Sequence, residues 1–248
     1  MRGIAANYKN ELQKLFGYKK YIVFLIIQML ICVIAVCSKL LAVVISEGSW
    51  NLNNLSSAVS LMTLFVDVII PFISMMGVCD LFASEFGDKT IRAVFLRPSF
   101  RYKVYAGKFL AVLTLTVINL LTVLISASVL DLIISGRIVS PLYSLSAYLI
   151  DIVPLAILIS MAVLINQLVK NSTLSMFLCI ILYVVLKLAG TYIPTLGGLL
   201  FTGYMQWHKL WLGSGVPLSA LLGKLWLMLG YGITFNAAGY YLFRYKEC

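Results

Sequence analysis

Six charged residues lie within or close to long apolar segments of the sequence: Lys39, Asp67, Asp131, Asp151, Lys187 and Lys224. A charged side chain among apolar neighbours usually pairs with an opposite charge or faces a water-filled cavity. Three acids and three bases at similar depth favour structural ion pairs. The alternative is a polar lining for a path through the protein. The candidates under both interpretations are Lys39, Asp67, Asp151, Lys187 and Lys224.

The sequence contains none of the short motifs typical of hydrolases or nucleotide-binding loops. We find no His-Glu-x-x-His, no Gly-x-Ser-x-Gly and no Gly-x-x-x-x-Gly-Lys-Ser/Thr. His208 is the single histidine, and its place between Trp207 and Lys209 predicts a surface position. The five cysteines are scattered and fit neither a disulfide framework nor a zinc site. We therefore expect this chain to bind no cofactor or metal and to catalyse no reaction by itself.

The composition is typical of a membrane protein. Hydrophobic residues make up 62% of the 248 residues and charged residues 11%, and the mean hydropathy is +1.01. Soluble domains carry about 25% charged residues, so hydrocarbon suits this surface better than water does. The net charge of +10 does not indicate nucleic-acid binding, because the cations stand at the ends of apolar segments. We predict an all-α integral membrane protein with one transmembrane domain, surrounded by lipid.

Six segments are long and apolar enough to cross about 30 Å of hydrocarbon as helices. They are residues 21–45, 58–84, 109–134, 142–168, 173–191 and 218–243. Pro71 predicts a kink in the second of them. Residues 1–20 carry an amphipathic helix, which we expect to lie at the membrane interface. Most of the 19 lysines and arginines fall on one side of this layout, which predicts that both termini lie in the cytoplasm.

Residues 191–217 are apolar and aromatic but interrupted by several Gly and Pro residues. A straight span does not need such residues, whereas aromatic side chains favour the membrane interface. We expect one or two short re-entrant or interfacial helices here, on the extracellular side and buried against protein. A seventh span is the alternative.

The basic segment 85–108 connects the second and third predicted spans. The Asp88 side chain can cap a helix and Pro98 prevents that helix from continuing, which predicts a short helix over residues 89–96. Its apolar residues are Ile91, Val94 and Phe95. Apolar residues beside cations indicate a docking site for a cytoplasmic partner. The alternative is a helix that lies on the membrane.

The same segment resembles the pattern of the ABC-2-type permeases, the membrane subunits of ABC exporters. In that pattern an acidic residue ends the second span, a Gly or Thr and a stretch like Leu-x-x-Pro-x-x-Arg follow, and Gly-Lys opens the third span. The matching residues are Glu85, Gly87, Thr90, Leu96, Pro98, Arg101, Gly107 and Lys108. Arg97 departs from the pattern, because the family often has a small or apolar residue before the proline. The six-span layout extends the resemblance over essentially the whole chain.

The resemblance implies a complex of several chains. The helix between the second and third spans would be a coupling helix seated on a separate ABC ATPase, present in two copies, which would hold ATP and Mg. The residues implied in coupling are Glu85, Asp88, Thr90, Ile91, Arg92, Phe95, Leu96, Arg97, Pro98 and Arg101. The N-terminal helix would touch the same ATPase. Two permeases, identical or similar, would pair around the path.

Compact permeases of this kind resemble those that export toxic or antimicrobial peptides across the bacterial cytoplasmic membrane. An interior of Leu, Ile, Val, Phe and Met with a few charges of both signs would suit an amphipathic peptide. A hydrophobic drug or a lipid-linked molecule is the alternative cargo. An ion-coupled secondary transporter is the alternative mechanism, although we find no inverted repeat in the sequence.

Overall fold

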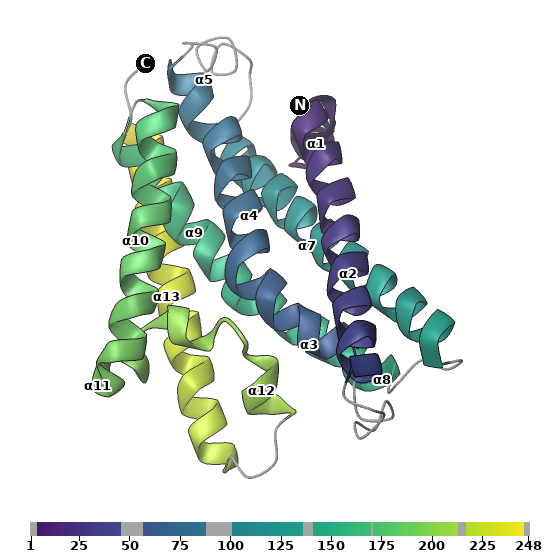
Figure 1. Cartoon of the computed structure of the whole chain (residues 1–248). Coiled ribbons are helices and arrows are strands. Elements are labelled where there is room, and N and C mark those ends of the chain that lie inside the picture. Colours follow the sequence, from purple (N-terminus) through teal and green to yellow (C-terminus); the bar gives the residue numbers. More distant parts are fainter. Residues whose placement is uncertain are drawn as a thin grey trace.

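The protein is a bundle of helices. The computed structural model describes residues 4–45, 57–87, 101–135, 141–169, 171–212 and 217–245, and the regular elements within these ranges are all helical. Figure 1 shows the long helices packed side by side. Five segments are long and apolar enough to cross a membrane: Lys19–Ser38, Leu61–Ala83, Arg101–Ile133, Pro141–Leu168 and Ser172–Tyr192. They correspond to the first five predicted spans, so the predicted all-α membrane architecture is confirmed at this level.

The N-terminal amphipathic segment forms a helix of its own. α1 (Ile4–Gly17) precedes α2 (Lys19–Ile45) and packs along α7 (Arg101–Ser135). Glu11 and Leu15 are buried in this packing. Part of α1 is therefore covered by protein, and its place at the membrane interface stays a prediction.

The second span contains two π-helical turns. Its elements in order are α3 (Ser57–Leu64), η2 (Phe65–Ile69), α4 (Ile70–Val78), η3 (Cys79–Ala83) and α5 (Ser84–Gly87). Pro71 follows the first π turn and lacks an N–H, so it cannot donate to the carbonyl of Asp67, four residues earlier. The hydroxyl of Tyr183, on α10 (Ser172–Tyr192), donates to that carbonyl at 2.7 Å. The position of the kink predicted at Pro71 thus coincides with a change from π-helix to α-helix.

The connection between the second and third spans is shorter than predicted. The second span continues to Gly87 and α7 begins at Arg101, so residues 101–108 belong to a helix and not to a loop. Val104 and Lys108 are already buried in these first turns of α7. Packing of these residues against the rest of the protein therefore stabilises helical turns that precede the strongly apolar part of the sequence. The helix predicted over residues 89–96 lies outside the described residues.

The fourth predicted span is broken at Asp151. α8 (Pro141–Ile150) and α9 (Ile152–Leu168) are separated by a turn at this residue. Pro154 explains the break, because its ring lacks the donor that the carbonyl of Ile150 would need and crowds that carbonyl. Asp151 consequently stands between two helices.

The segment after the fifth span folds into short helices. These are α11 (Pro194–Gly197), the 3₁₀ helix η4 (Phe201–Tyr204) and α12 (His208–Trp211). Glycines permit its close packing, since a Cβ on Gly197 would overlap the carbonyl oxygen of Gly190. We call residues 193–212 the connecting segment. No continuous helix crosses this described part of the chain, whereas a re-entrant, extracellular position stays a prediction.

α13 (Leu218–Tyr245) occupies the place of the sixth predicted span and packs against α9. The two ends of the described chain lie at one end of the bundle, where Figure 1 also places α5. We call this the terminal end, and the opposite one, with α3, α8, α11 and α12, the loop end. Arg101 of α7 donates a hydrogen bond to the carbonyl of Arg244 in α13 at the terminal end. An even number of spans would place both ends of the chain on the same side of the membrane, in agreement with their common position at the terminal end. That α13 is the sixth span, and that the terminal end faces the cytoplasm, stay predictions.

Candidate functional site

A buried lysine joins three helical segments at the terminal end. The side chain of Lys108 has 0% of its surface exposed. Its Nζ donates to Oε2 of Glu85 at 2.7 Å, to Oε2 of Glu11 at 3.1 Å and to the carbonyl of Leu81 at 2.9 Å. Lys14 of α1 donates to the other oxygen of Glu85, Oε1. We call Glu11, Lys14, Glu85 and Lys108 the ion cluster.

The charges of the ion cluster stabilise one another. Burial by itself raises the pKa of Glu85, but the charge of Lys108 and the hydrogen bonds from Lys108 and Lys14 outweigh burial and hold this pKa below its usual 4.5. Partial burial lowers the pKa of Lys14. The hydrogen bond to Glu85 and the charge of Glu85 outweigh that effect, so the pKa of Lys14 lies above its usual 10.5. At neutral pH Glu85 is ionised and Lys14 is protonated.

Gly107, next to Lys108, lets α1 approach α7 closely. A Cβ on Gly107 would lie 3.1 Å from the backbone nitrogen of Tyr8 and 3.2 Å from the Cβ of Asn7. The hydroxyl of Tyr8 is also hydrogen-bonded to Oγ1 of Thr114 at 3.0 Å. The Gly-Lys pair of the sequence pattern therefore has a local structural role, because Gly107 admits α1 and Lys108 binds it.

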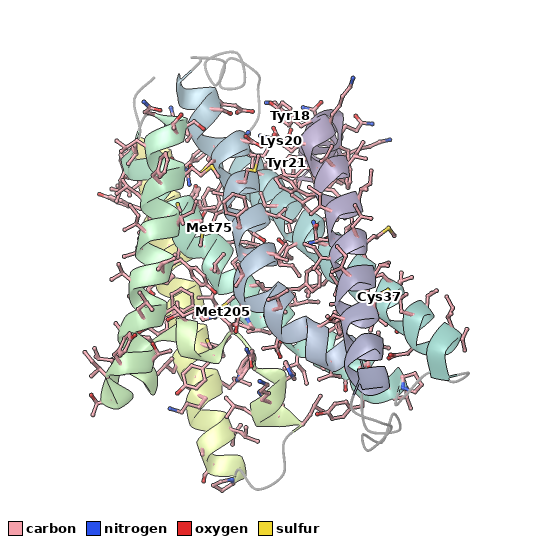
Figure 2. All side chains as sticks on the ribbon, viewed as in Figure 1. Tyr18, Lys20, Tyr21, Cys37, Met75 and Met205 are labelled. Carbon is pink, nitrogen blue, oxygen red and sulfur yellow. The ribbon has the colours of Figure 1, made fainter. Side chains whose placement is uncertain are left out.

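A second charged contact fixes the junction of α1 and α2. Asp80, in the π turn η3, pairs with Lys20 at 2.6 Å between Oδ2 and Nζ and accepts a hydrogen bond from the hydroxyl of Tyr21. Figure 2 shows Tyr18, Lys20 and Tyr21 grouped at this junction. The N-terminal part of the chain is thus tied to the second span at Asp80 as well as at Glu85.

At the loop end, Asp67 binds both the fifth span and the connecting segment. Its Oδ1 lies 2.7 Å from Nζ of Lys187, and its Oδ2 accepts a hydrogen bond from Gln206. The predicted pairing of opposite charges is confirmed for Asp67 and Lys187. Their side chains are 21% and 30% exposed, so this pair remains accessible from outside the chain.

Asp151 binds the connecting segment in the interior. Its Oδ1 accepts the backbone N–H of His208 at 2.7 Å, and its Oδ2 lies 2.7 Å from Nδ1 of the same residue. The side chains are 0% and 1% exposed, so the predicted surface position of His208 is wrong. An aspartate far away in the sequence supplies an acceptor for both N–H groups, and the neighbouring residues alone could not indicate this.

The other charges predicted near the spans have different surroundings. Lys224 of α13 donates to the carbonyl of Gly198 at 2.8 Å and lies 5.0 Å from the ring centre of Tyr204. It therefore contacts the connecting segment through a carbonyl and an aromatic ring, where we expected an acid. Asp131 is buried. The side chain of Lys39 lies outside those that the structure describes.

An apolar groove of about 450 Å³ lies between α2, the second span and α10. Its apolar lining includes Phe24, Ile27 and Ile31 of α2 and Phe72 of α4. Among its lining residues, Asp67 and Lys187 carry the charges. The accessible ion pair therefore lies at an otherwise apolar surface.

Comparison with known proteins identifies the chain at the level of a family. A family model described as ABC-2 family transporter protein matches residues 5–211. The chain belongs to this family. The match includes the ion cluster, Asp67, Asp151 and the connecting segment up to Trp211. No curated protein matches the sequence. This ABC-2 family protein is therefore an integral membrane component of a transporter.

In this ABC-2 family protein, most residues implied in ATPase coupling lie outside the described ranges. These are Asp88, Thr90, Ile91, Arg92, Phe95, Leu96, Arg97 and Pro98. Glu85 is buried in the ion cluster, so any part it has in coupling would act through the positions of α1 and α7. Arg101 is exposed at the terminal end. The coupling role of these residues stays a prediction.

Several residues of these contacts were not predicted as site residues, among them Glu11, Lys14, Lys108, Gln206 and His208. A signal existed for Glu11, because it stands in the same helical stripe as Tyr8 and Leu15, among apolar residues. Lys108 likewise stands in the stripe of Val104 and Leu115 on α7. A charge inside an apolar stripe indicates a buried partner. For Gln206 and His208 the sequence holds no comparable signal.

Proposed function

We propose that this protein is the transmembrane subunit of an ATP-driven exporter, and that a separate ATPase subunit supplies the energy. The proposed cargo is an amphipathic molecule, a toxic or antimicrobial peptide. The groove between α2, the second span and α10 is the observation that carries this proposal. It offers an apolar wall with one accessible acid and one accessible base, Asp67 and Lys187.

An amphipathic peptide has the features that such a groove can bind. Its apolar face would cover the aliphatic and aromatic side chains of the wall, and its charged side chains would exchange with Asp67 or Lys187. We propose that a second permease chain closes the open side of the groove. The family supports ATP as the energy source over an ion gradient.

A hydrophobic drug or a lipid-linked molecule is the second candidate cargo. The apolar lining favours it equally, because 14 residues line the groove and only the Asp67–Lys187 pair among them is charged. The two candidates differ in one respect. A peptide with several charges should respond to the charge of the groove, whereas an uncharged drug should not.

The test uses the tagged permease purified with the ATPase subunit that accompanies it and reconstituted into liposomes. ATP hydrolysis is measured with cationic and anionic amphipathic peptides, lipids and hydrophobic antibiotics. Lys187→Met leaves the charge of Asp67 uncompensated. We expect the half-maximal concentration of a cationic peptide to fall about two- to fivefold and that of an anionic peptide to rise similarly.

Lys209→Met is the matched control, since Lys209 is exposed on α12 and the same charge is removed. It should leave both concentrations unchanged. Stimulation by non-peptide compounds alone would show that the peptide assignment is wrong, while the exporter assignment would survive. If no ATPase accompanies the permease, the exporter assignment itself fails.

A further inference from the structure

The ammonium group of Lys108 has a hydrogen-bond acceptor for each of its donors. These acceptors belong to α1 and to the end of the second span. An ammonium carries three N–H groups. The acceptors at 2.7–3.1 Å are Glu11 from α1, the carbonyl of Leu81 from η3 and Glu85 from α5. A single buried side chain therefore joins the N-terminal helix to the end of the second span and to the start of the third.

The packing of α1 against α7 depends on the contact between Lys108 and Glu11. Glu11 is buried on that face, one turn before the fully buried Leu15. The Gly107 backbone is close to α1 at Asn7 and Tyr8, so the two helices are in close contact next to Lys108. If Lys108 released Glu11, the carboxylate would have to leave this interface or stay buried without its charged partner.

The ion cluster is balanced in charge. Glu11 and Glu85 contribute two negative charges, and Lys14 and Lys108 contribute two positive ones. Removing one member of a buried ion pair is strongly destabilising, because the remaining charge is left buried and unpaired. Replacing both members together costs much less free energy of unfolding. Loss of Lys108 alone would leave two carboxylates for Lys14. Loss of Lys108 and Glu11 together would leave the balanced pair of Lys14 and Glu85.

We propose that Lys108 is a positioning residue that locks α1 to the second and third spans, so that these three segments move as one body when the transporter works. The inference rests on the proposed function, together with the expectation that the ATPase touches the N-terminal helix α1. It adds the residue that transmits a displacement of α1 to α7. Lys108 achieves this inside the permease, without touching the partner.

Hydrogen–deuterium exchange on the permease purified with its ATPase tests this inference. Uptake is followed in peptides from α1 and from the first turns of α7, with and without ATP and orthovanadate. In the wild type, the nucleotide state should change uptake in both regions together. In Lys108→Met, uptake in α1 should rise about tenfold or more in rate, as expected for a lost hydrogen bond to a buried charge, and the change in α7 should disappear.

The variants separate positioning from simple loss of structure. Lys108→Met/Glu11→Gln restores charge balance and should return α1 toward the wild-type uptake, while Lys9→Met, on the exposed side of α1, should match the wild type. If Lys108→Met does not fold, Glu11→Gln is the milder variant and should raise uptake in α1 while leaving α7 protected. Wild-type uptake in α1 and a joint nucleotide response in Lys108→Met, or in Glu11→Gln where that variant is used, would overturn the inference. Failure of the wild-type permease to bind an ATPase would instead reject the proposed function.

Discussion

The contact between Asp151 and His208 depends on two acceptor atoms of one carboxylate. Oδ1 accepts the backbone N–H of His208 and Oδ2 is bonded to its ring nitrogen Nδ1, with both side chains buried. A buried donor that loses its acceptor costs about 1–3 kcal/mol, and Asp151 serves two donors. The chemistry of this one side chain therefore decides whether α12 stays against the end of α8.

Two substitutions at this position should separate charge from hydrogen bonding. Asp151→Leu removes both acceptors, and we expect a loss of about 3 kcal/mol or more in the free energy of unfolding. Asp151→Asn keeps an oxygen for the backbone N–H and can donate to Nδ1 if the imidazole changes tautomer, so its loss should be smaller. Thermal unfolding of the permease in the same detergent measures both. Equal midpoints for the two variants would show that the hydrogen bonds retained by Asn, above all the one from the backbone N–H of His208, do not contribute to stability.

Residue-scale prediction succeeded in part for the charges that lie within the apolar segments. The charge pattern predicted that these residues pair with opposite charges, without assigning partners, and Asp67 and Lys187 do pair in the structure. The surface position predicted for His208 was wrong, because that prediction used only the flanking residues and these do not indicate the partner Asp151. Lys108 and Glu11 are separated by 97 residues, although each breaks an apolar stripe. Sequence periodicity thus indicates that a charge is buried, and only the fold shows its partner.

At the scale of elements, a hydrogen bond joins the second span to the fifth at a backbone carbonyl that a proline leaves without its helical donor. Pro71 cannot donate to the carbonyl of Asp67, and the hydroxyl of Tyr183 does so from α10. The same residue, Asp67, also pairs with Lys187 of α10 through its side chain. Backbone and side chain of Asp67 therefore both join these two elements.

A double-mutant cycle should detect the backbone part of this connection. Tyr183→Phe removes the donor and should cost about 1 kcal/mol of unfolding free energy. Pro71→Ala supplies an N–H that can bond the same carbonyl within the helix. In the Pro71→Ala background, Tyr183→Phe should therefore cost clearly less, and chemical denaturation of the four proteins measures the difference. The same cost in both backgrounds would show that Tyr183 does not substitute for the missing helical donor.

Element boundaries were predictable where apolar length decides them and less so where packing does. The fifth span was expected over residues 173–191, and α10 covers Ser172–Tyr192 with Asn171 as its N-cap. The third span was expected to begin at residue 109, but α7 begins at Arg101 because its first turns pack against α1. The break at Asp151 was missed, since the apolar run of the fourth span hides the effect of Pro154. The π turns at Asp67 and Asp80 leave no sequence signal that we can identify.

At the scale of the whole molecule, charged contacts join helices at both ends of the bundle. The ion cluster joins α1, the second span and α7 at the terminal end, and Asp67 and Asp151 hold the connecting segment at the loop end. The second span takes part in both, since Asp80 and Glu85 lie near one end of it and Asp67 toward the other. This span is also well covered by protein. In its apolar part 61% of the residues are buried, whereas the value for α10 is 17%. A displacement of the second span would therefore reach both sites.

We predict that two permease chains pair through the face of α10, because its own chain covers little of this helix. The proposed exporter requires a second chain to close the groove, and α10 forms one wall of it. Ile181 on α10, next in sequence to the groove-lining Ile180, is 55% exposed. Val68 on the second span lines the groove and is 59% exposed. Cysteines at these two positions should form covalent dimers in the membrane on oxidation with copper phenanthroline.

The control is a cysteine on another exposed face of the same protein. Ile233 on α13 is 68% exposed, so Ile233→Cys has at least the same access to lipid but should stay monomeric. Cys37 is itself exposed, and it is replaced by Ser together with Cys248 in every variant to remove background dimers. Because a random collision in the bilayer would crosslink all exposed faces alike, only the difference between positions is informative. Dimers from Ile181→Cys and Val68→Cys without dimers from Ile233→Cys would support pairing around the groove. Equal yields at the three positions, or dimers from Ile233→Cys alone, would show that the two chains do not meet at this groove.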